Sequence, residues 1–191
     1  MKRGKLILVI GPTGSGKGTL LAHIRSIFPE LIFPISCTTR AMRPGEVNGQ
    51  TYYFVSSDEF AARLSRGEFL ETAVYGGNQY GTLKSQILPF IEEGKMVVRE
   101  IEVQGARQIQ QMLPADDLRI IYIDAGSWDE LERRVVARAP IGQPELEARR
   151  KRYEDETSFK AEATVVIKNP EGGLEQAKAD FEQAVRTITT G

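Results

Sequence analysis

KLILVIGPTGSGKGT, residues 5–19, is the stretch that decides the fold. Its first part, Lys5–Ile10, is a nearly continuous aliphatic run, which is typical of a strand buried on both faces. A glycine-rich loop follows the strand, and the spacing of apolar residues over Thr19–Phe28 predicts a helix after the loop. Small residues let backbone N–H groups point inward, and the helix adds its positive N-terminus. The stretch therefore predicts a strand–loop–helix unit that binds a chain of phosphates.

The rest of the chain repeats this alternation of strands and helices. Further short apolar runs predict strands over Lys95–Ile101, Leu118–Asp124 and Ala163–Lys168. Helical patterns lie over Leu83–Glu93, Val103–Met112, Trp128–Arg138 and Gly172–Ile188. The sequence thus predicts an α/β fold, with a parallel sheet that contains the phosphate-binding loop (P-loop) and is flanked by helices.

Two regions interrupt the alternation. Residues 36–82 combine turn signals with alternating apolar residues and one helix pattern, Ser57–Arg66, which predicts a small β-rich insertion. The turn-rich tip Ala139–Pro144 lies between arginine-bearing helices and predicts a mobile, helical lid. We therefore expect a core of residues 1–35, 83–138 and 150–191, an insertion of residues 36–82, and a lid of residues 139–149.

Composition restricts the function more than it defines it. The 191 residues carry a net charge of −1, which gives no general argument for nucleic-acid or membrane binding. A single histidine, His23, excludes a His-rich metal site and a Ser-His-Asp triad. A single cysteine, Cys37, excludes an internal disulfide and favours a reducing, cytoplasmic location; we assign it no chemistry. No stretch approaches the length of a membrane span.

The glycine-rich loop departs at one position from the usual pattern G-x-x-x-x-G-K-[ST]. Gly18 follows Lys17 where a serine or threonine hydroxyl is usual, so we expect Thr19 to supply the hydroxyl, directly or through a water on Mg²⁺. Lys17 is expected to neutralise the phosphates. The alternative is a strand-to-helix turn that is merely rich in glycine. The expected ATP-binding residues in the loop are Gly11, Pro12, Thr13, Gly14, Ser15, Gly16, Lys17, Gly18 and Thr19.

Three further segments resemble the guanylate kinase family. Residues 35–56, ISCTTRAMRPGEVNGQTYYFVS, match the family pattern S-x-x-T-R-x-x-R-P-G-E-x-x-G-x-x-Y. Residues 69–82, FLETAVYGGNQYGT, match FLE…GNxYGT, and residues 100–109, EIEVQGARQI, match D-x-D-x-Q-G-x-x-x-I except that Glu100 and Glu102 replace two aspartates. The resemblance covers nearly the whole chain. It implies transfer of a phosphoryl group from ATP to GMP, with Mg²⁺ accompanying ATP.

The resemblance also implies roles for individual residues. Planar guanidinium groups suit a monophosphate dianion, and one carboxylate, Glu71, can accept both donors on the guanine edge. Adenine has no donor at N1, so the same carboxylate would discriminate against it. The GMP-binding residues implied are Ser36, Arg40, Arg43, Tyr52, Glu71, Tyr80, Thr82, Glu100 and Glu102.

The arginines near the predicted lid complete the expected site. The resemblance places lid arginines at Arg134, Arg138 and Arg149, which with Lys17 and Arg40 are expected to stabilise the transferred charge. A solvated helix face and a nucleic-acid patch are the other interpretations of this cluster. The segment VVIKNPEG implies that Asn169 approaches the adenine of ATP.

Two other functions remain open from sequence. One is a guanylate-kinase-like binding module that takes a phosphorylated partner instead of GMP, and the other is a kinase for another small phosphorylated acceptor. An intact Lys17 disfavours the first, and the joint presence of Ser36, Glu71 and Thr82 disfavours the second.

Overall fold

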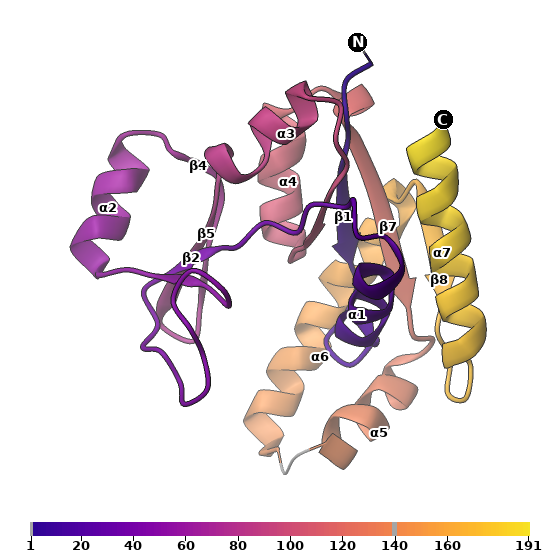
Figure 1. Cartoon of the computed structure of the whole chain (residues 1–191). Coiled ribbons are helices and arrows are strands. Elements are labelled where there is room, and N and C mark those ends of the chain that lie inside the picture. Colours follow the sequence, from indigo (N-terminus) through magenta and orange to yellow (C-terminus); the bar gives the residue numbers. More distant parts are fainter. Residues whose placement is uncertain (1, 139–140) are drawn as a thin grey trace. The chain divides into compact units, whose positions relative to one another are not determined.

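The computed structural model describes residues 2–138 and 141–191, without the side chain of Arg138. The chain divides into two compact units, and each is described by itself (Figure 1). Unit 1 comprises Met1–Leu6, Ile32–Arg99 and Gln104–Leu118. Unit 2 comprises Ile7–Leu31, Glu100–Val103 and Arg119–Gly191.

The four apolar runs that predict strands of a parallel sheet form one sheet with the strand order β6-β1-β7-β8. Its strands are β1 (Leu6–Ile10), β6 (Val97–Glu100), β7 (Leu118–Asp124) and β8 (Val165–Lys168). β7 and β8 pair in parallel, from Ile121 opposite Val165 to Asp124 opposite Lys168. Every residue of β1 is buried, as its aliphatic run predicts for a strand covered on both faces. The α/β fold class expected from the sequence is confirmed.

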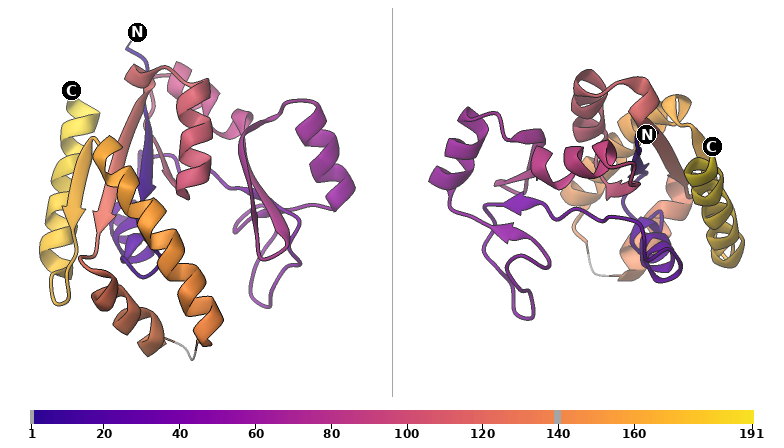
Figure 2. Two further views of the ribbon diagram at one scale, coloured as in Figure 1. Left: turned by 180° about the vertical axis from the view of Figure 1, so that it is seen from behind. Right: turned by 45° about the horizontal axis from the view of Figure 1, so that its top comes forward.

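Helices cover both faces of β7 and β8. Unit 2 contains α1 (Lys17–Ile27), α5 (Trp128–Arg138), α6 (Gln143–Ser158) and α7 (Leu174–Thr190), with a 3₁₀ turn at Phe159–Glu162. α1 and α7 lie on one face of these strands and α6 lies on the other (Figure 2). The helix α1 follows the glycine-rich loop directly, so the sheet fixes where the loop lies.

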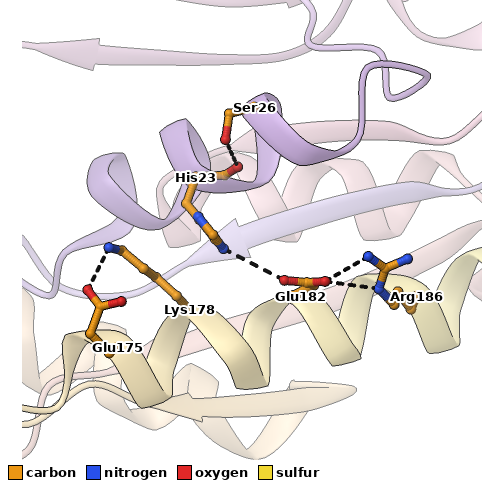
Figure 3. A network of polar contacts seen from close by, with 6 residues as sticks. All are labelled: His23, Ser26, Glu175, Lys178, Glu182 and Arg186. Carbon is orange, nitrogen blue, oxygen red and sulfur yellow. Dashed lines mark hydrogen bonds and ion pairs between the residues drawn. The ribbon is translucent and has the colours of Figure 1, made fainter.

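A row of polar contacts runs along α1 and α7, which lie side by side (Figure 3). His23 Nε2 lies 3.9 Å from a Glu182 carboxylate oxygen, and Arg186 donates to the same carboxylate at 2.7 Å. On α7, Lys178 pairs with Glu175 at 2.7 Å. The one histidine of the chain therefore lies at a contact between two helices.

The insertion predicted over residues 36–82 contains a second sheet, with the strand order β3-β2-β5-β4. Its strands are β2 (Cys37–Thr38), β3 (Tyr53–Phe54), β4 (Phe69–Tyr75) and β5 (Asn78–Leu83), and its helix is α2 (Ser57–Ser65). The rings of Phe60 and Phe69 stack at 4.5 Å between α2 and the sheet. Gly81 lies against Phe69, where a Cβ atom would come within 2.7 Å of the ring, so only glycine fits.

Two segments differ from the sequence-based prediction. The helix expected over residues 83–93 is interrupted, because Leu83 completes β5 and Ile87 (φ −131°, ψ −57°) separates a 3₁₀ turn, Lys84–Gln86, from α3 (Leu88–Glu92). The helix α6 begins at Gln143, within the expected turn-rich tip, because Pro144 is compatible with the first turn of a helix. Residues 139 and 140 of the predicted lid lie outside the described residues.

The remaining elements belong to the connections between the strands. α4 (Val103–Met112) follows β6, and a 3₁₀ turn, Ala115–Asp117, leads into β7. Among the described residues, no helix has the length and apolar character needed to cross a membrane.

Candidate active site

The glycine-rich loop, residues 11–18, is shaped by backbone that only glycine accommodates. Gly16 caps α1 with φ +93°, in the left-handed region, and a Cβ atom there would lie 2.4 Å from Asn169 Nδ2. At Gly11 a Cβ atom would lie 2.5 Å from the carbonyl oxygen of Ile123. The glycines therefore allow the loop to pack against β7 and the end of β8 at the start of α1.

Lys17 lies almost completely buried at the first position of α1. Its ammonium donates to the carbonyl oxygens of Gly11, at 2.5 Å, and Pro12, at 3.2 Å. A Glu100 carboxylate oxygen lies 3.9 Å away. The positive charge is thus held over the loop, at the N-terminal end of a helix, where an anion is favoured.

Asn169, which follows β8, holds the loop from the other end of the chain. Its side-chain Nδ2 donates to the carbonyl oxygen of Ser15 at 2.8 Å, and its backbone oxygen accepts from Arg134 at 3.0 Å. Its own N–H donates to the Asp124 oxygen at 2.7 Å, which continues the β7–β8 pairing. One buried residue therefore positions both the loop and a predicted catalytic arginine of α5.

One face of α6 turns toward the loop. The residues Arg149, Arg152, Tyr153 and Glu156 are spaced three or four apart and so share one side of the helix. They line a pocket together with residues of the loop and of α5: Pro12, Thr13, Trp128 and Val135. Arg149 donates to Glu145 at 2.9 Å, and this contact lowers the pKa of Glu145. The predicted lid arginine Arg149 is thus brought to the same pocket as the loop.

The start of α1 presents few groups for a metal. At Gly18 a Cβ atom would meet nothing within 4 Å, and Thr19 is exposed in the same turn. Within residues 2–138 and 141–191, no three His, Cys, Asp or Glu side chains gather in a way that could hold a metal ion. This donor set fits a cation such as Mg²⁺ that is held mainly by the phosphates of a substrate and by water.

In unit 1, a second group of predicted residues forms a buried polar cluster at the ends of β4 and β5. Thr82 donates to the Glu71 carboxylate at 2.5 Å, and both side chains are buried. Arg99 of β6 donates to Thr82 at 3.3 Å and to the Ser36 hydroxyl. Burial raises the pKa of Glu71, while the Thr82 hydrogen bond and the Arg99 charge oppose the shift. The cluster presents an acceptor inside a protected site.

Arg40 is held by a partner within its own loop. Its guanidinium makes two parallel hydrogen bonds to Glu46, at 3.0 and 2.7 Å, and Glu46 also accepts from the Arg43 N–H at 2.7 Å. The Arg40 charge lies 5.5 Å from the Tyr52 ring, which meets Tyr80 edge-on at 6.0 Å. The hydrogen bond to Glu46 raises the pKa of Arg40, which stays charged at all ordinary pH.

The structure gathers the predicted residues into two sets, one in each unit. The set of unit 2 comprises residues 11–19, Arg134, Arg149 and Asn169, and the set of unit 1 comprises Ser36, Arg40, Arg43, Tyr52, Glu71, Tyr80 and Thr82. Glu100 and Glu102, predicted with the second set, belong to unit 2 and are exposed. Arg138 ends α5, but its side chain lies outside the described residues.

Three polar residues of these clusters are missed by sequence reasoning. Arg99 belongs to a strand whose apolar run predicts core, although a charged residue there, next to Glu100, is a usable signal. Glu46 is visible in the sequence only as one letter of a motif. Glu156 resembles the many other charges of a solvated helix, and no pattern distinguishes it from them.

Comparisons with known proteins agree on one family. A family model described as guanylate kinase matches residues 3–187. Curated guanylate kinases from Trichormus variabilis (42% identical, 97% of this chain and 87% of that protein) and Rubrobacter xylanophilus (38% identical, 100% and 98%) are similar to it.

A solved structure shows the same likeness in three dimensions. The crystal structure of guanylate kinase from Anaplasma phagocytophilum is 27% identical, covers 100% of this chain and 89% of its own, and superposes with a TM-score of 0.75. With the family model and two curated relatives in agreement over nearly all residues, the chain belongs to the guanylate kinase family.

Proposed function

We propose that the protein transfers the γ-phosphoryl group of ATP to GMP and releases ADP and GDP. The observation that carries the proposal is the buried carboxyl group of Glu71. It accepts a hydrogen bond from the Thr82 hydroxyl and provides a hydrogen-bond acceptor inside the cluster of unit 1. Family membership supports the same reaction.

Glu71 is proposed to recognise guanine. Guanine presents adjacent N–H donors on one edge, and an ionised carboxylate accepts both. Adenine presents an acceptor at the first of these positions, so a buried carboxylate facing it would lose a hydrogen bond without compensation from water. Ser36 and Thr82 supply hydroxyl groups around the same position, and Arg99 holds those hydroxyls through its hydrogen bonds.

The GMP phosphate is proposed to bind at the loop of residues 36–54. Arg40 and Arg43 offer guanidinium groups, and the hydroxyls of Tyr52 and Tyr80 offer further donors. The Glu46 carboxylate holds Arg40 in one orientation, which lowers the entropy lost when a phosphate binds.

The phosphates of ATP are proposed to bind at residues 11–19. Lys17 neutralises charge on the β- and γ-phosphates, and the backbone N–H groups of the loop donate to the same oxygens. Arg134 and Arg149, with Arg138, stabilise the charge of the phosphoryl group as a GMP phosphate oxygen attacks in line. No side-chain nucleophile is required, because positioning and charge stabilisation are sufficient for this reaction class. Asn169 is proposed to approach the adenine of ATP.

Mg²⁺ is proposed to enter with ATP. When bound, it would neutralise charge on the phosphates of ATP, and Thr19 is the residue proposed to contribute a hydroxyl, directly or through water. We further propose a cytoplasmic location, since the single thiol, Cys37, is free and buried, and reduced thiols are usual in the cytosol.

A coupled assay of ADP release tests the proposed function directly. The protein is given Mg-ATP with GMP, dGMP, AMP, CMP, UMP or no acceptor. We expect turnover with GMP, or with GMP and dGMP, and background rates otherwise. Equal rates with all acceptors, or none with any nucleotide, would overturn the assignment.

The Lys17→Ala variant tests the phosphate-binding role of the loop. Turnover is expected to fall by about 10³-fold or more, because the charge on the transferred group loses its closest cation. Lys95→Ala is the matched control, since the exposed Lys95 pairs with Glu93 and lies over the Phe90 ring, and neither residue belongs to the proposed site. Turnover in Lys17→Ala that equals that of the control would contradict the proposed role.

A further inference from the structure

Glu156 is a buried carboxyl group that the proposed mechanism does not use. It lies in the last turns of α6, and only 6% of its surface is exposed, whereas its neighbours Glu154 and Asp155 are exposed. Glutamate is rarely buried without a specific partner, because desolvation penalises its charge. The environment of Glu156 therefore needs an explanation.

The groups around Glu156 come from several elements of unit 2. Its carboxyl makes a side-chain hydrogen bond to Glu102, from the segment after β6, and lies in the field of Lys17 from α1. Arg152, one turn earlier on α6, adds a second positive charge, and the Tyr122 ring of β7 lies close enough for Glu156 to raise its pKa. Two carboxyl groups can make a direct hydrogen bond only if one of them carries a proton.

The same residue lies at one end of a polar face of α6. Glu156 and Arg149 are separated by two helical turns on that face, and both line the pocket that contains Pro12 and Thr13 of the glycine-rich loop. Lys17, which Glu156 also influences, is itself bonded to the carbonyl oxygens of Gly11 and Pro12. Glu156 therefore lies where the arginine-bearing helix and the loop line one pocket.

We propose that Glu156 is a positioning residue that stays protonated and donates a hydrogen bond to Glu102. This hydrogen bond holds α6 against the phosphate-binding loop, and a neutral Glu156 adds no second negative charge that would compete for Lys17. This role rests on the proposed ATP site. A neutral Glu156 leaves the ammonium of Lys17 available to phosphates and keeps the Arg149 end of α6 at the pocket. An ionised Glu156 would repel Glu102 and attract Lys17 away from its ligand.

The electrostatics of the site agree with this arrangement. Burial raises the pKa of Glu156 to about 8, repulsion by Glu102 and the hydrogen bond to it add to the rise, and Lys17 and Arg152 oppose it. Because the folded state binds this proton more tightly than the unfolded chain does, the stabilisation is complete below the ordinary glutamate pKa of 4.5. It is lost as the pH rises through about 8.

The test compares the wild type with Glu156→Gln, Glu156→Leu and the matched control Glu154→Gln. The amide in Glu156→Gln keeps a donor for Glu102 but cannot ionise, and the leucine in Glu156→Leu has no donor. Glu154→Gln makes the same charge change at an exposed position of the same helix. The midpoint of thermal unfolding and kcat/KM for Mg-ATP are measured from about pH 6 to about pH 9. The midpoint of thermal unfolding can be measured whether or not the protein is catalytically active.

We expect the unfolding midpoint of the wild type and of Glu154→Gln to fall over this range, and that of Glu156→Gln to fall less. Above the Glu156 pKa, kcat/KM for Mg-ATP in the wild type should decline about tenfold per pH unit, whereas Glu156→Gln should retain its value. Glu156→Leu should show a higher KM for Mg-ATP at every pH, because Glu102 loses its donor.

Two results would overturn the proposal. One is an equal pH slope of the unfolding midpoint in the wild type and Glu156→Gln. The other is an equal loss of activity in Glu156→Gln and Glu156→Leu, which would mean that the carboxylate itself is required. If the wild type shows no turnover with Mg-ATP and GMP, the proposed function fails, but the unfolding slopes still decide whether Glu156 keeps its proton.

Discussion

At the scale of single residues, Gly18 is the clearest departure from the usual loop sequence. Its backbone is not in the left-handed region, and a Cβ atom there would meet nothing within 4 Å. A serine at this position is therefore accommodated without rearrangement, and the hydroxyl that phosphate-binding loops commonly offer to Mg²⁺ can be restored.

We predict that Gly18→Ser lowers the Mg²⁺ concentration needed for half-maximal turnover. One added hydrogen bond of about 1 kcal/mol corresponds to roughly a fivefold change. Gly18→Ala is the matched control, because it also raises helix propensity, by about 0.8–1 kcal/mol, but adds no hydroxyl. Titration of Mg²⁺ at fixed ATP distinguishes the variants, and identical Mg²⁺ curves for serine and alanine would show that position 18 is remote from the metal.

Glu71 allows a second prediction at this scale. In Glu71→Gln, one amide N–H faces a guanine donor, so kcat/KM for GMP should fall by about 10²-fold or more while that for AMP rises. Because burial raises the pKa of Glu71, its ionised form is costly in the folded state, and the neutral variant should unfold at no lower temperature than the wild type. Glu92→Gln, an exposed change in unit 1, is the control. An unchanged GMP-to-AMP ratio would exclude the recognition role.

The raised pKa of Glu71 also predicts how GMP binding depends on pH. The carboxylate must be ionised to accept both guanine donors, so KM for GMP should increase as the pH falls toward the raised pKa. The pH profile of KM for GMP should flatten in Glu71→Gln. A profile that is the same in both proteins would assign the pH dependence to another group.

At the scale of secondary-structure elements, the end of β8 is joined to the glycine-rich loop by Asn169. Loss of its side chain in Asn169→Ala removes the hydrogen bond to Ser15 but leaves the backbone acceptor of Arg134 in place. We predict a loss of stability of about 1 kcal/mol, which lowers the unfolding midpoint by roughly 2–4 °C, and a several-fold increase in KM for ATP. Lys168→Ala, an exposed neighbour, should change neither.

Comparison of ATP with GTP separates two roles of Asn169. If the residue acts only by holding the loop, KM rises equally for both nucleotides in Asn169→Ala. If its side chain also contacts adenine, as the family resemblance implies, Asn169→Ala should show a smaller preference for ATP over GTP than the wild type. Steady-state kinetics with both donors therefore determines whether the second role exists.

The elements also show what the sequence could and could not predict. Regular apolar runs such as Leu118–Asp124 were predicted to the residue, because a buried parallel strand needs continuous aliphatic side chains. The helix expected over residues 83–93 was wrong at its start, because Leu83 and Phe69 pair across the β4–β5 hairpin, and a local pattern cannot reveal that partner. Glu156 was invisible for the same reason: its neighbours Glu102 and Lys17 lie far from it along the chain.

At the scale of the whole molecule, the two units carry separate sets of site residues, and Cys37 provides a natural probe of one of them. Its side chain is fully buried in the core of unit 1, and burial raises the pKa of its thiol. A thiol reagent therefore reacts only after unit 1 opens locally. The sequence assigned no chemistry to Cys37, and the surrounding core of Phe60, Phe69 and Leu83 became evident only in the folded chain.

We predict that GMP slows the alkylation of Cys37. At a concentration of about 100 times its Kd, a ligand that binds only the closed form of unit 1 should slow the reaction by about 100-fold. ATP, proposed to bind residues of unit 2, should slow it much less. The rate is followed by mass spectrometry, with urea-unfolded protein as the control for full reactivity. Equal protection by both nucleotides would show that the units open together.

The hydrogen bond between Asn169 and Ser15 spans 154 positions of the chain, and this separation has a consequence for biosynthesis. The ribosome makes the glycine-rich loop well before the amide that holds it, because Asn169 follows Ser15 by 154 positions. A nascent or prematurely terminated polypeptide thus carries the complete loop sequence without its support. Nucleotide binding by the newly made enzyme should begin abruptly, when β8 joins the sheet, and chains that lack β8 and Asn169 should not compete with finished ones for ATP.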